Sequence, residues 1–184
     1  MKVIFGGTFD PVHIGHLRMA NELAETLSVK AVSLMPCYEA VHKQKVGASS
    51  EHRLNMLALA IKNDTLLALD DRECRRGEAS YTIDSLLELR SELGVESLCL
   101  VMGADSANSL SSWLRVGEFS KLTHVVVINR SEAQSIVVNK MIIAEKLKSL
   151  GFSLAMSLNE LKEVSAGSFF YRFTAIRYIK YLYS

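Results

Sequence analysis

The residues best suited to chemistry lie near the N-terminus, in positions 6–16, which read Gly-Gly-Thr-Phe-Asp-Pro-Val-His-Ile-Gly-His. Two glycines, Gly6 and Gly7, let the backbone approach a ligand closely. His13 and His16 lie three residues apart, so both rings can face one ligand across a helix start. Unpaired N–H groups at such a start favour an anion, most often phosphate. Each feature alone is common in ordinary turns, but together they predict a phosphate site.

The flanking residues indicate how this stretch is positioned. The apolar run Val3–Phe5 precedes it, and apolar residues at helical spacing follow it from Leu17 to Leu27. This pattern predicts a strand, a loop and a helix start. The stretch contains neither Gly-x-Gly-x-x-Gly nor a P-loop, which argues against hydride transfer and against a P-loop NTPase.

Apolar runs and helical spacing alternate along the rest of the chain. Strands are predicted at 30–36, 66–69, 97–102, 124–129 and 152–156, and helices at 50–63, 80–93 and 140–150, with a last helix beginning at 174–177. Ser80 is predicted to cap its helix. Residues 70–73 are predicted to be a solvated acidic loop. Alternating strands and helices predict an α/β fold with a parallel sheet, in a single domain over residues 1–184.

Composition excludes several classes of protein. Lysine and arginine number 21 against 20 aspartates and glutamates, so the net charge of +1 gives no sign of a nucleic-acid-binding surface. Cys37, Cys74 and Cys99 form no Cys-x-x-Cys pair, which suggests neither a zinc site nor a disulfide framework. The N-terminal apolar run is too short for a signal peptide, and no run approaches the ~20 residues that cross a bilayer. We therefore expect a cytoplasmic protein that binds no membrane.

Residues 6–16 resemble the signature of the nucleotidyltransferases that carry His-x-Gly-His, and their first eight residues resemble the nicotinate mononucleotide adenylyltransferase family. Ser80-Tyr81-Thr82 and the pattern Gly103-Ala104-Asp105 followed by Trp113 also resemble that family. The resemblance implies a Rossmann-like doubly wound parallel sheet of the nucleotidyltransferase type, with helices on both faces. In strand order 3-2-1-4-5, strands one and four are neighbours, so residues 6–16 and 103–106 should meet in one crevice.

The implied reaction transfers the adenylyl group of ATP to nicotinate mononucleotide and releases pyrophosphate. The acceptor phosphate that attacks the α-phosphorus is already an anion, so catalysis needs positioning and charge stabilisation but no general base. Mg²⁺ is expected to accompany ATP and to neutralise the pyrophosphate that leaves. The expected partners are therefore ATP and nicotinate mononucleotide, and a homo-oligomeric state is a further expectation.

The resemblance also assigns roles to residues. The catalytic residues it implies are His13, His16 and Arg177. The residues implied to bind ATP are Gly6, Gly7, Thr8, Phe9, His13, His16, Gly103, Asp105, Thr174 and Arg177. The residues implied to bind the acceptor are Lys43, Tyr81, Thr82, Trp113 and Arg130. Trp113 would stack on the pyridine ring, although a tryptophan also commonly serves as core.

The resemblance weakens towards the C-terminus. The family string Ile-Ser-Ser-Thr-x-Ile-Arg corresponds here to 171–177, where Thr174 and Arg177 match but Arg172 and Phe173 replace both serines. Ala40 and Val41 stand where the family has prolines before Lys43. Two alternatives therefore stay open, a catalytically impaired nucleotide-binding protein of this fold and an adenylyltransferase for nicotinamide mononucleotide or phosphopantetheine.

Overall fold

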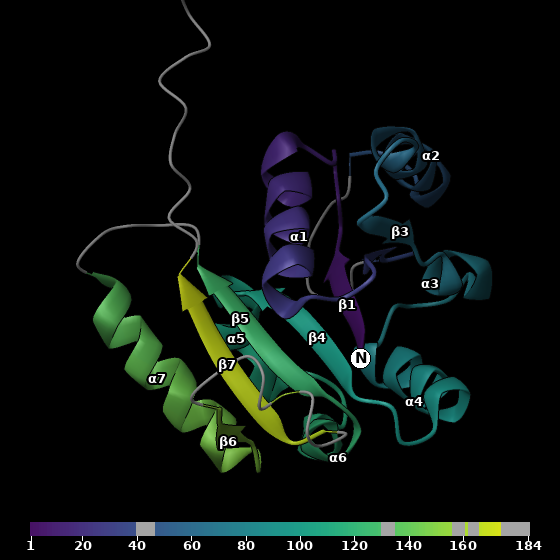
Figure 1. Cartoon of the computed structure of the whole chain (residues 1–184). Coiled ribbons are helices and arrows are strands. Elements are labelled where there is room, and N and C mark those ends of the chain that lie inside the picture. The colour runs from purple at the N-terminus through teal and green to yellow at the C-terminus, as the bar shows by residue number, and fades with distance from the viewer. Residues whose placement is uncertain (40–46, 130–134, 156–160, 162–165, 174–184) are drawn as a thin grey trace, which may run out of the picture.

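The computed structural model describes residues 1–39, 47–129, 135–155, 161 and 166–173. In these residues the chain forms one sheet of seven strands in the order β3-β2-β1-β4-β5-β7-β6, with helices on both sides (Figure 1). Every pair of neighbouring strands is parallel. The predicted α/β doubly wound architecture and the neighbouring positions of strands one and four are therefore confirmed.

The elements follow one another in an alternating order. The strands are β1 (Lys2–Gly7), β2 (Val32–Pro36), β3 (Leu67–Leu69), β4 (Leu98–Gly103), β5 (His124–Asn129), β6 (Ser153–Leu154) and β7 (Ser168–Phe173). The α-helices are α1 (Ile14–Leu27), α2 (Ser50–Ile61), α3 (Arg72–Arg76), α4 (Thr82–Leu93), α5 (Ala104–Ser109), α6 (Phe119–Leu122) and α7 (Ser135–Ser149). Two short 3-10 helices, η1 (Leu110–Ser112) and η2 (Val116–Glu118), lie between α5 and α6.

The sheet separates two hydrophobic cores. Val3 and Phe5 of β1 face the core built with α1 and α2, whereas Ile4 faces the core built with α4, α6 and α7. Strands buried on both faces are apolar at nearly every position, which explains why the strands read as near-continuous hydrophobic runs, with exceptions such as Ser33 and His124. This arrangement leaves the carboxyl ends of the strands as the edge on which loops can carry polar groups.

Several local predictions were wrong. Residues 70–73 do not form a solvated loop, because Arg72 begins the helix α3 and Asp70, Arg72 and Glu73 are all buried. Arg72 Nε lies 2.8 Å from Asp70 Oδ1, and Arg72 Nη1 lies 3.1 Å from Glu92 Oε1, so the charges compensate one another. Ion pairing therefore allows this acidic segment to be folded inward.

Other predicted boundaries were also displaced. The strand predicted at 152–156 is reduced to Ser153–Leu154, and the helix predicted from residue 140 begins at Ser135. The strand β7 was not predicted, although it pairs with β5 over five residues from Phe169 to Phe173. The helix predicted at 174–177 lies outside the described residues. None of the helices in the described part of the chain is long and apolar enough to cross a bilayer.

Candidate functional site

The turn between β1 and α1 is built around the ring of Phe9. Phe9 has a left-handed backbone with φ of 49° and a side chain only 2% exposed. Its ring packs edge-on against Phe5 at 5.8 Å and against His16 at 5.1 Å, measured between ring centroids. A Cβ added to Gly7 would lie 3.0 Å from this ring. Gly7 therefore leaves room for Phe9, a role that the sequence analysis had given to an approaching ligand.

His13 and His16 stand together at the start of α1. Their rings stack with centroids 3.7 Å apart, and the backbone N–H of His13 donates to His16 Nδ1 at 3.4 Å. His13 is the N-cap residue of α1, so both rings lie where the free N–H groups of the helix begin. A Cβ on Gly15 would meet the His13 ring at 3.0 Å, which explains the glycine between the two histidines. The predicted proximity of the two rings is confirmed.

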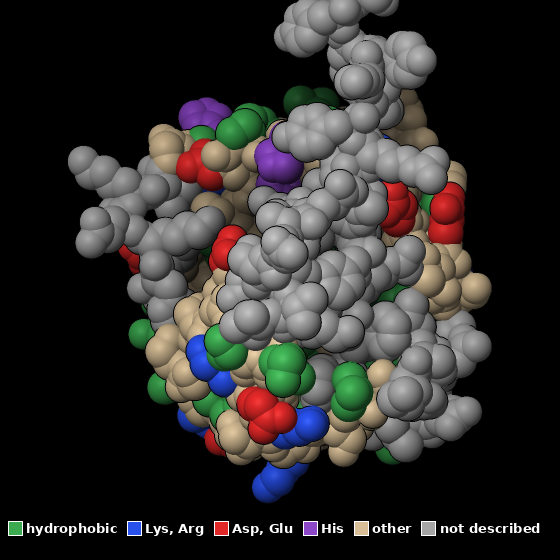
Figure 2. All heavy atoms as spheres, turned by 90° about the vertical axis from the view of Figure 1, so that its left-hand side faces the viewer, with side chains coloured by type: hydrophobic (Ala, Val, Ile, Leu, Met, Phe, Trp, Pro, Cys, Tyr) green, Lys and Arg blue, Asp and Glu red, His purple; other side chains and the backbone are tan. Residues whose placement is uncertain are grey.

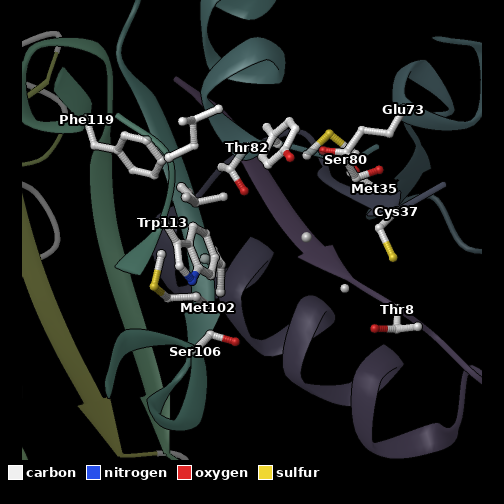
Figure 3. A pocket seen from close by; sticks show the side chains of 16 residues that line it. Thr8, Met35, Cys37, Glu73, Ser80, Thr82, Met102, Ser106, Trp113 and Phe119 are labelled. Atoms are coloured by element: carbon white, nitrogen blue, oxygen red, sulfur yellow. The ribbon is translucent and has the colours of Figure 1, made fainter. Parts of the chain in front are cut away.

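One cavity lies between the end of β1, the start of α4 and the segment after η1 (Figure 3), and Phe9, His13 and His16 are not among the residues that line it. The residues that line it come from β1, β2, β4, α3, α4, α5, α6 and the segments that follow β2, precede α4 and follow η1, and they include Gly6, Gly7, Thr8, Met35, Cys37, Glu73, Ser80, Tyr81, Thr82, Met102, Ser106, Trp113, Leu114 and Phe119. Residues from the first and fourth strands thus meet in one crevice, as predicted from the topology.

Trp113 and Phe119 form the aromatic side of the cavity. Their rings meet edge-on with centroids 6.3 Å apart, and Phe119 is fully buried beneath. Figure 3 shows the Trp113 indole beside the open space, near Met102 and Ser106. Trp113 therefore belongs to the cavity wall as well as to the core. A planar aromatic ligand could lie against this face.

The opposite wall is the segment that enters α4. Tyr81 is the N-cap residue and Thr82 the first helical residue, and both line the cavity. Ser80 does not cap the helix as predicted, because its Oγ accepts the N–H of Tyr38 at 2.8 Å instead. This hydrogen bond connects the segment that enters α4 to the segment that follows β2. Free N–H groups in the first turn of α4 suit a carboxylate.

Glu73 is a buried carboxyl group behind this wall. Burial raises the pKa of Glu73, while hydrogen bonds from Ser80 and Ser85 and the charge of Arg76 act in the opposite direction. Ser85 Oγ donates to Glu73 Oε1 at 2.8 Å. Cys37 lies on the same side of the cavity, and burial likewise raises the pKa of its thiol, opposed by the charge of Arg53.

The structure describes some of the remaining predicted residues and not others. Gly103 is the N-cap residue of α5, and Asp105 is exposed in its first turn, whereas the neighbouring Ser106 lines the cavity. The other four predicted residues, Lys43, Arg130, Thr174 and Arg177, lie outside the described residues. Their roles stay predictions.

The sequence analysis missed Met35, Cys37, Glu73 and Ser106 as cavity residues. Met35 and Cys37 belong to the end of an apolar strand, where a hydrophobic residue carries no signal of a site. Ser106 directly follows a residue that was assigned. Glu73 lies in the acidic stretch that was predicted to be solvated, and its burial follows only from α3.

A family model for cytidylyltransferase-like proteins matches residues 4–167. The chain belongs to this family. The match begins within β1 and ends before β7, so it includes the turn with both histidines, the α4 entry and Trp113. The part of the chain that forms the cavity is therefore the part that the family shares.

Two relatives are similar over different lengths. A probable nicotinate-nucleotide adenylyltransferase of Marinobacter nauticus is 41% identical over 193 residues, which cover 99% of this chain and 89% of the relative. One of Cellvibrio japonicus is 50% identical over 128 residues, which cover 69% of this chain and 61% of the relative. Higher identity over the shorter alignment agrees with the weaker C-terminal resemblance.

Among solved structures, the Plasmodium falciparum nicotinic acid mononucleotide adenylyltransferase complexed with NaAD superposes with a TM-score of 0.62. The alignment covers 89% of this chain and 90% of the other at 18% sequence identity. At this level of identity the likeness establishes the common fold.

The face of the molecule drawn in Figure 2 carries no single dominant charge in its visible described atoms. Figure 2 shows acidic, basic and hydrophobic side chains interspersed, with histidine side chains in the upper part of the view. This mixture accords with the net charge of +1. Attraction for phosphate must therefore come from local groups in this family member.

Proposed function

We infer that the chain is a nicotinate-nucleotide adenylyltransferase, which transfers the adenylyl group of ATP to nicotinate mononucleotide and releases pyrophosphate in NAD biosynthesis. One observation carries this inference. The same cavity is lined by the turn at Gly6, Gly7 and Thr8 and by the groups suited to a pyridine carboxylate, Thr82 and Trp113. Two substrates held in one crevice can react without any further rearrangement of their binding segments.

The phosphates of ATP are proposed to bind at the start of α1. The positive end of the helix dipole and the stacked rings of His13 and His16 would face the triphosphate. Donors fixed before the reaction stabilise the charge that develops on the phosphoryl oxygens, which is how such a site accelerates transfer. Neither histidine needs to remove a proton, because the attacking phosphate is already an anion.

Mg²⁺ is proposed to enter with ATP as part of the substrate. The described residues form no group of three or more His, Cys, Asp or Glu side chains that could hold a metal ion. Bound to the phosphate oxygens, the ion would neutralise the departing pyrophosphate.

The acceptor ring is proposed to lie against Trp113 with its carboxylate at the start of α4. The N–H groups of the first turn, beginning at Thr82, would donate to the carboxylate. A neutral carboxamide gains less from the positive helix end, so nicotinamide mononucleotide should react more slowly. The cytoplasmic location and the homo-oligomeric state expected from the sequence stay predictions.

Pyrophosphate release tests the proposed function. ATP and Mg²⁺ would be supplied with nicotinate mononucleotide, nicotinamide mononucleotide or phosphopantetheine in parallel. Release that is fastest with the nicotinate compound supports the inference and the carboxylate site. Equal rates with the first two acceptors would overturn the carboxylate site. No release from folded protein that still binds ATP would favour the catalytically impaired alternative.

A further inference from the structure

Arg53 of α2 is a charged side chain enclosed in the protein, with only 1% of it exposed. Its Nη1 donates to the carbonyl of Thr8 at 2.8 Å and its Nη2 to the carbonyl of Tyr38 at 2.8 Å. Nε donates to the carbonyl of Ala48 at 3.3 Å. All three strong acceptors are uncharged backbone groups.

Buried arginines normally lie against a carboxylate, which cancels their charge. Within the described residues, no carboxylate lies within ion-pair distance of Arg53. The positive charge is therefore held by dipoles and is not cancelled there. It acts on the cavity wall, where it opposes the effect of burial on the pKa of the Cys37 thiol.

The two carbonyls bound by Arg53 mark the point where two strands part. β1 and β2 pair as far as Gly7 and Pro36, and the N–H of Cys37 then donates to the carbonyl of Gly7 at 3.0 Å. Thr8 directly follows Gly7, and Tyr38 directly follows Cys37. Arg53 therefore joins the turn that leads to α1 to the cavity wall that follows β2.

The hydrogen bond to Thr8 also fixes the direction of a donor. In a trans peptide the C=O and the following N–H point in opposite directions. The Thr8 carbonyl faces Arg53, so the N–H of Phe9 faces away from it. Phe9 has its left-handed φ of 49° at this peptide, a conformation that needs support from its surroundings.

We propose that Arg53 is a positioning residue for the phosphates of ATP: it holds the Thr8–Phe9 peptide so that its N–H is presented to the phosphates, and it keeps that peptide fixed relative to Tyr38. Its uncancelled charge adds attraction for the same anions. This proposal rests on the proposed function, since it concerns where ATP lies. Arg53 itself does not contact the reacting atoms.

Arg90 of α4 provides a matched control. It also donates to several backbone carbonyls, with Nη1 bound to Gly94 at 3.0 Å and to Glu96 at 2.7 Å, and with Nε bound to Leu122 at 3.1 Å. These acceptors lie before the amino ends of β4 and β5, at the edge opposite the cavity. Loss of Arg90 removes comparable hydrogen bonds without touching the turn after β1.

The experiment compares Arg53→Lys and Arg53→Met with Arg90→Lys and Arg90→Met. Urea unfolding gives the folded fraction, calorimetry gives the Kd for Mg-ATP, and pyrophosphate release gives kcat and both KM values. We expect Arg53→Met to lower kcat per folded molecule roughly ten- to hundredfold and to weaken ATP binding, since small misplacements of binding groups are costly. Lysine keeps the charge and one donor contact, so it should restore part of the loss.

In both Arg53 variants the KM for nicotinate mononucleotide should change less than the Kd for ATP. The Arg90 variants should lose stability, whereas their Kd for ATP and their KM for nicotinate mononucleotide should stay unaltered. Wild-type kcat and ATP affinity in folded Arg53→Met would overturn the proposal. Failure of both Arg53 variants to fold, while the Arg90 variants fold, would assign Arg53 to stability and overturn it too. An inactive wild-type protein would contradict the proposed function, and the ATP affinities would still decide the role of Arg53.

Discussion

Gly6 and Gly7 are adjacent at the end of β1, yet alanine should have opposite consequences at the two positions. A Cβ at Gly7 would lie 3.0, 3.1 and 3.3 Å from three atoms of the Phe9 ring, closer than packed carbon atoms normally approach. A Cβ at Gly6 would meet the Cε of Met35 at 4.0 Å, an ordinary contact with a flexible side chain. Gly7→Ala therefore requires the ring of Phe9 to move, whereas Gly6→Ala requires nothing to move.

The surroundings of Phe9 give the size of the effect. Its ring is 2% exposed and lies between Phe5 and His16, so it has no free space to enter. Overpacking of this kind costs about 1–3 kcal/mol. Replacing glycine by alanine also reduces the entropy of the unfolded chain, which stabilises both variants by roughly 0.4–1 kcal/mol. This gain cancels in the comparison, so Gly7→Ala should be about 1–3 kcal/mol less stable than Gly6→Ala.

Urea unfolding of both variants and the wild type, measured in parallel, gives this difference directly. In a thermal melt it corresponds to about 2–4 °C for each kcal/mol in a chain of this size. Gly7→Ala should also lower turnover per folded molecule, because Phe9 packs on His16. Equal stability of the two variants would refute the reasoning, since it would mean that the space over Gly7 is not filled by Phe9.

Three further changes test the site. His16→Ala should lower turnover by about 10², as the loss of one fixed donor to the charge of a transition state typically does, and a rate near the wild type would exclude it from catalysis. Trp113→Ala should raise the KM for the acceptor more than that for ATP; lost stability with unchanged KM would make Trp113 a core residue only. Burial raises the pKa of Glu73, so the folded protein keeps this carboxyl group protonated to a higher pH than the unfolded chain does. The stability of the wild type therefore falls as the pH rises from the ordinary pKa of a carboxyl group to this raised pKa. Glutamine stays neutral, so the stability of Glu73→Gln should increase relative to that of the wild type over the same rise in pH. If urea unfolding showed a stability difference between the two proteins that does not change with pH, this prediction would be contradicted.

Whereas the order of the first five strands was implied by the family resemblance, their positions could be predicted because a doubly wound parallel sheet leaves a clear pattern. Its strands are apolar at every position, as Leu98–Met102 and Val125–Ile128 illustrate. The helix α3 could not be predicted in this way. Its burial depends on ion pairs between Arg72 and residues as distant as Glu92, and such pairs have no local signature. The strand β7 depends likewise on pairing with β5, which comes about forty residues earlier in the chain.

The site was predictable to the extent that its residues cluster in short strings. His13 and His16 are brought together by one helix start, and Tyr81 and Thr82 by another, so local spacing was sufficient. Arg53 was different: it resembles the family at this position of its helix, but neither that resemblance nor local spacing indicates what it contacts. Its contacts reach Thr8, 45 residues away, and they exist only because β1 and β2 end side by side.

The strand order also explains why the C-terminal string can belong to the same site as residues 6–16. β4 ends at Gly103, which pairs with Ile128 of β5, and the next residue of β5, Asn129, pairs with Phe173 at the end of β7. In a parallel sheet these three ends, together with that of β1, lie on one edge. The strand β7 therefore ends, at Phe173, on the edge that carries the cavity. Up to Phe173 the departure from the family string is therefore one of chemistry rather than topology: phenylalanine at 173 brings no hydroxyl group, so we expect more of the phosphate binding to come from the turn that Arg53 holds.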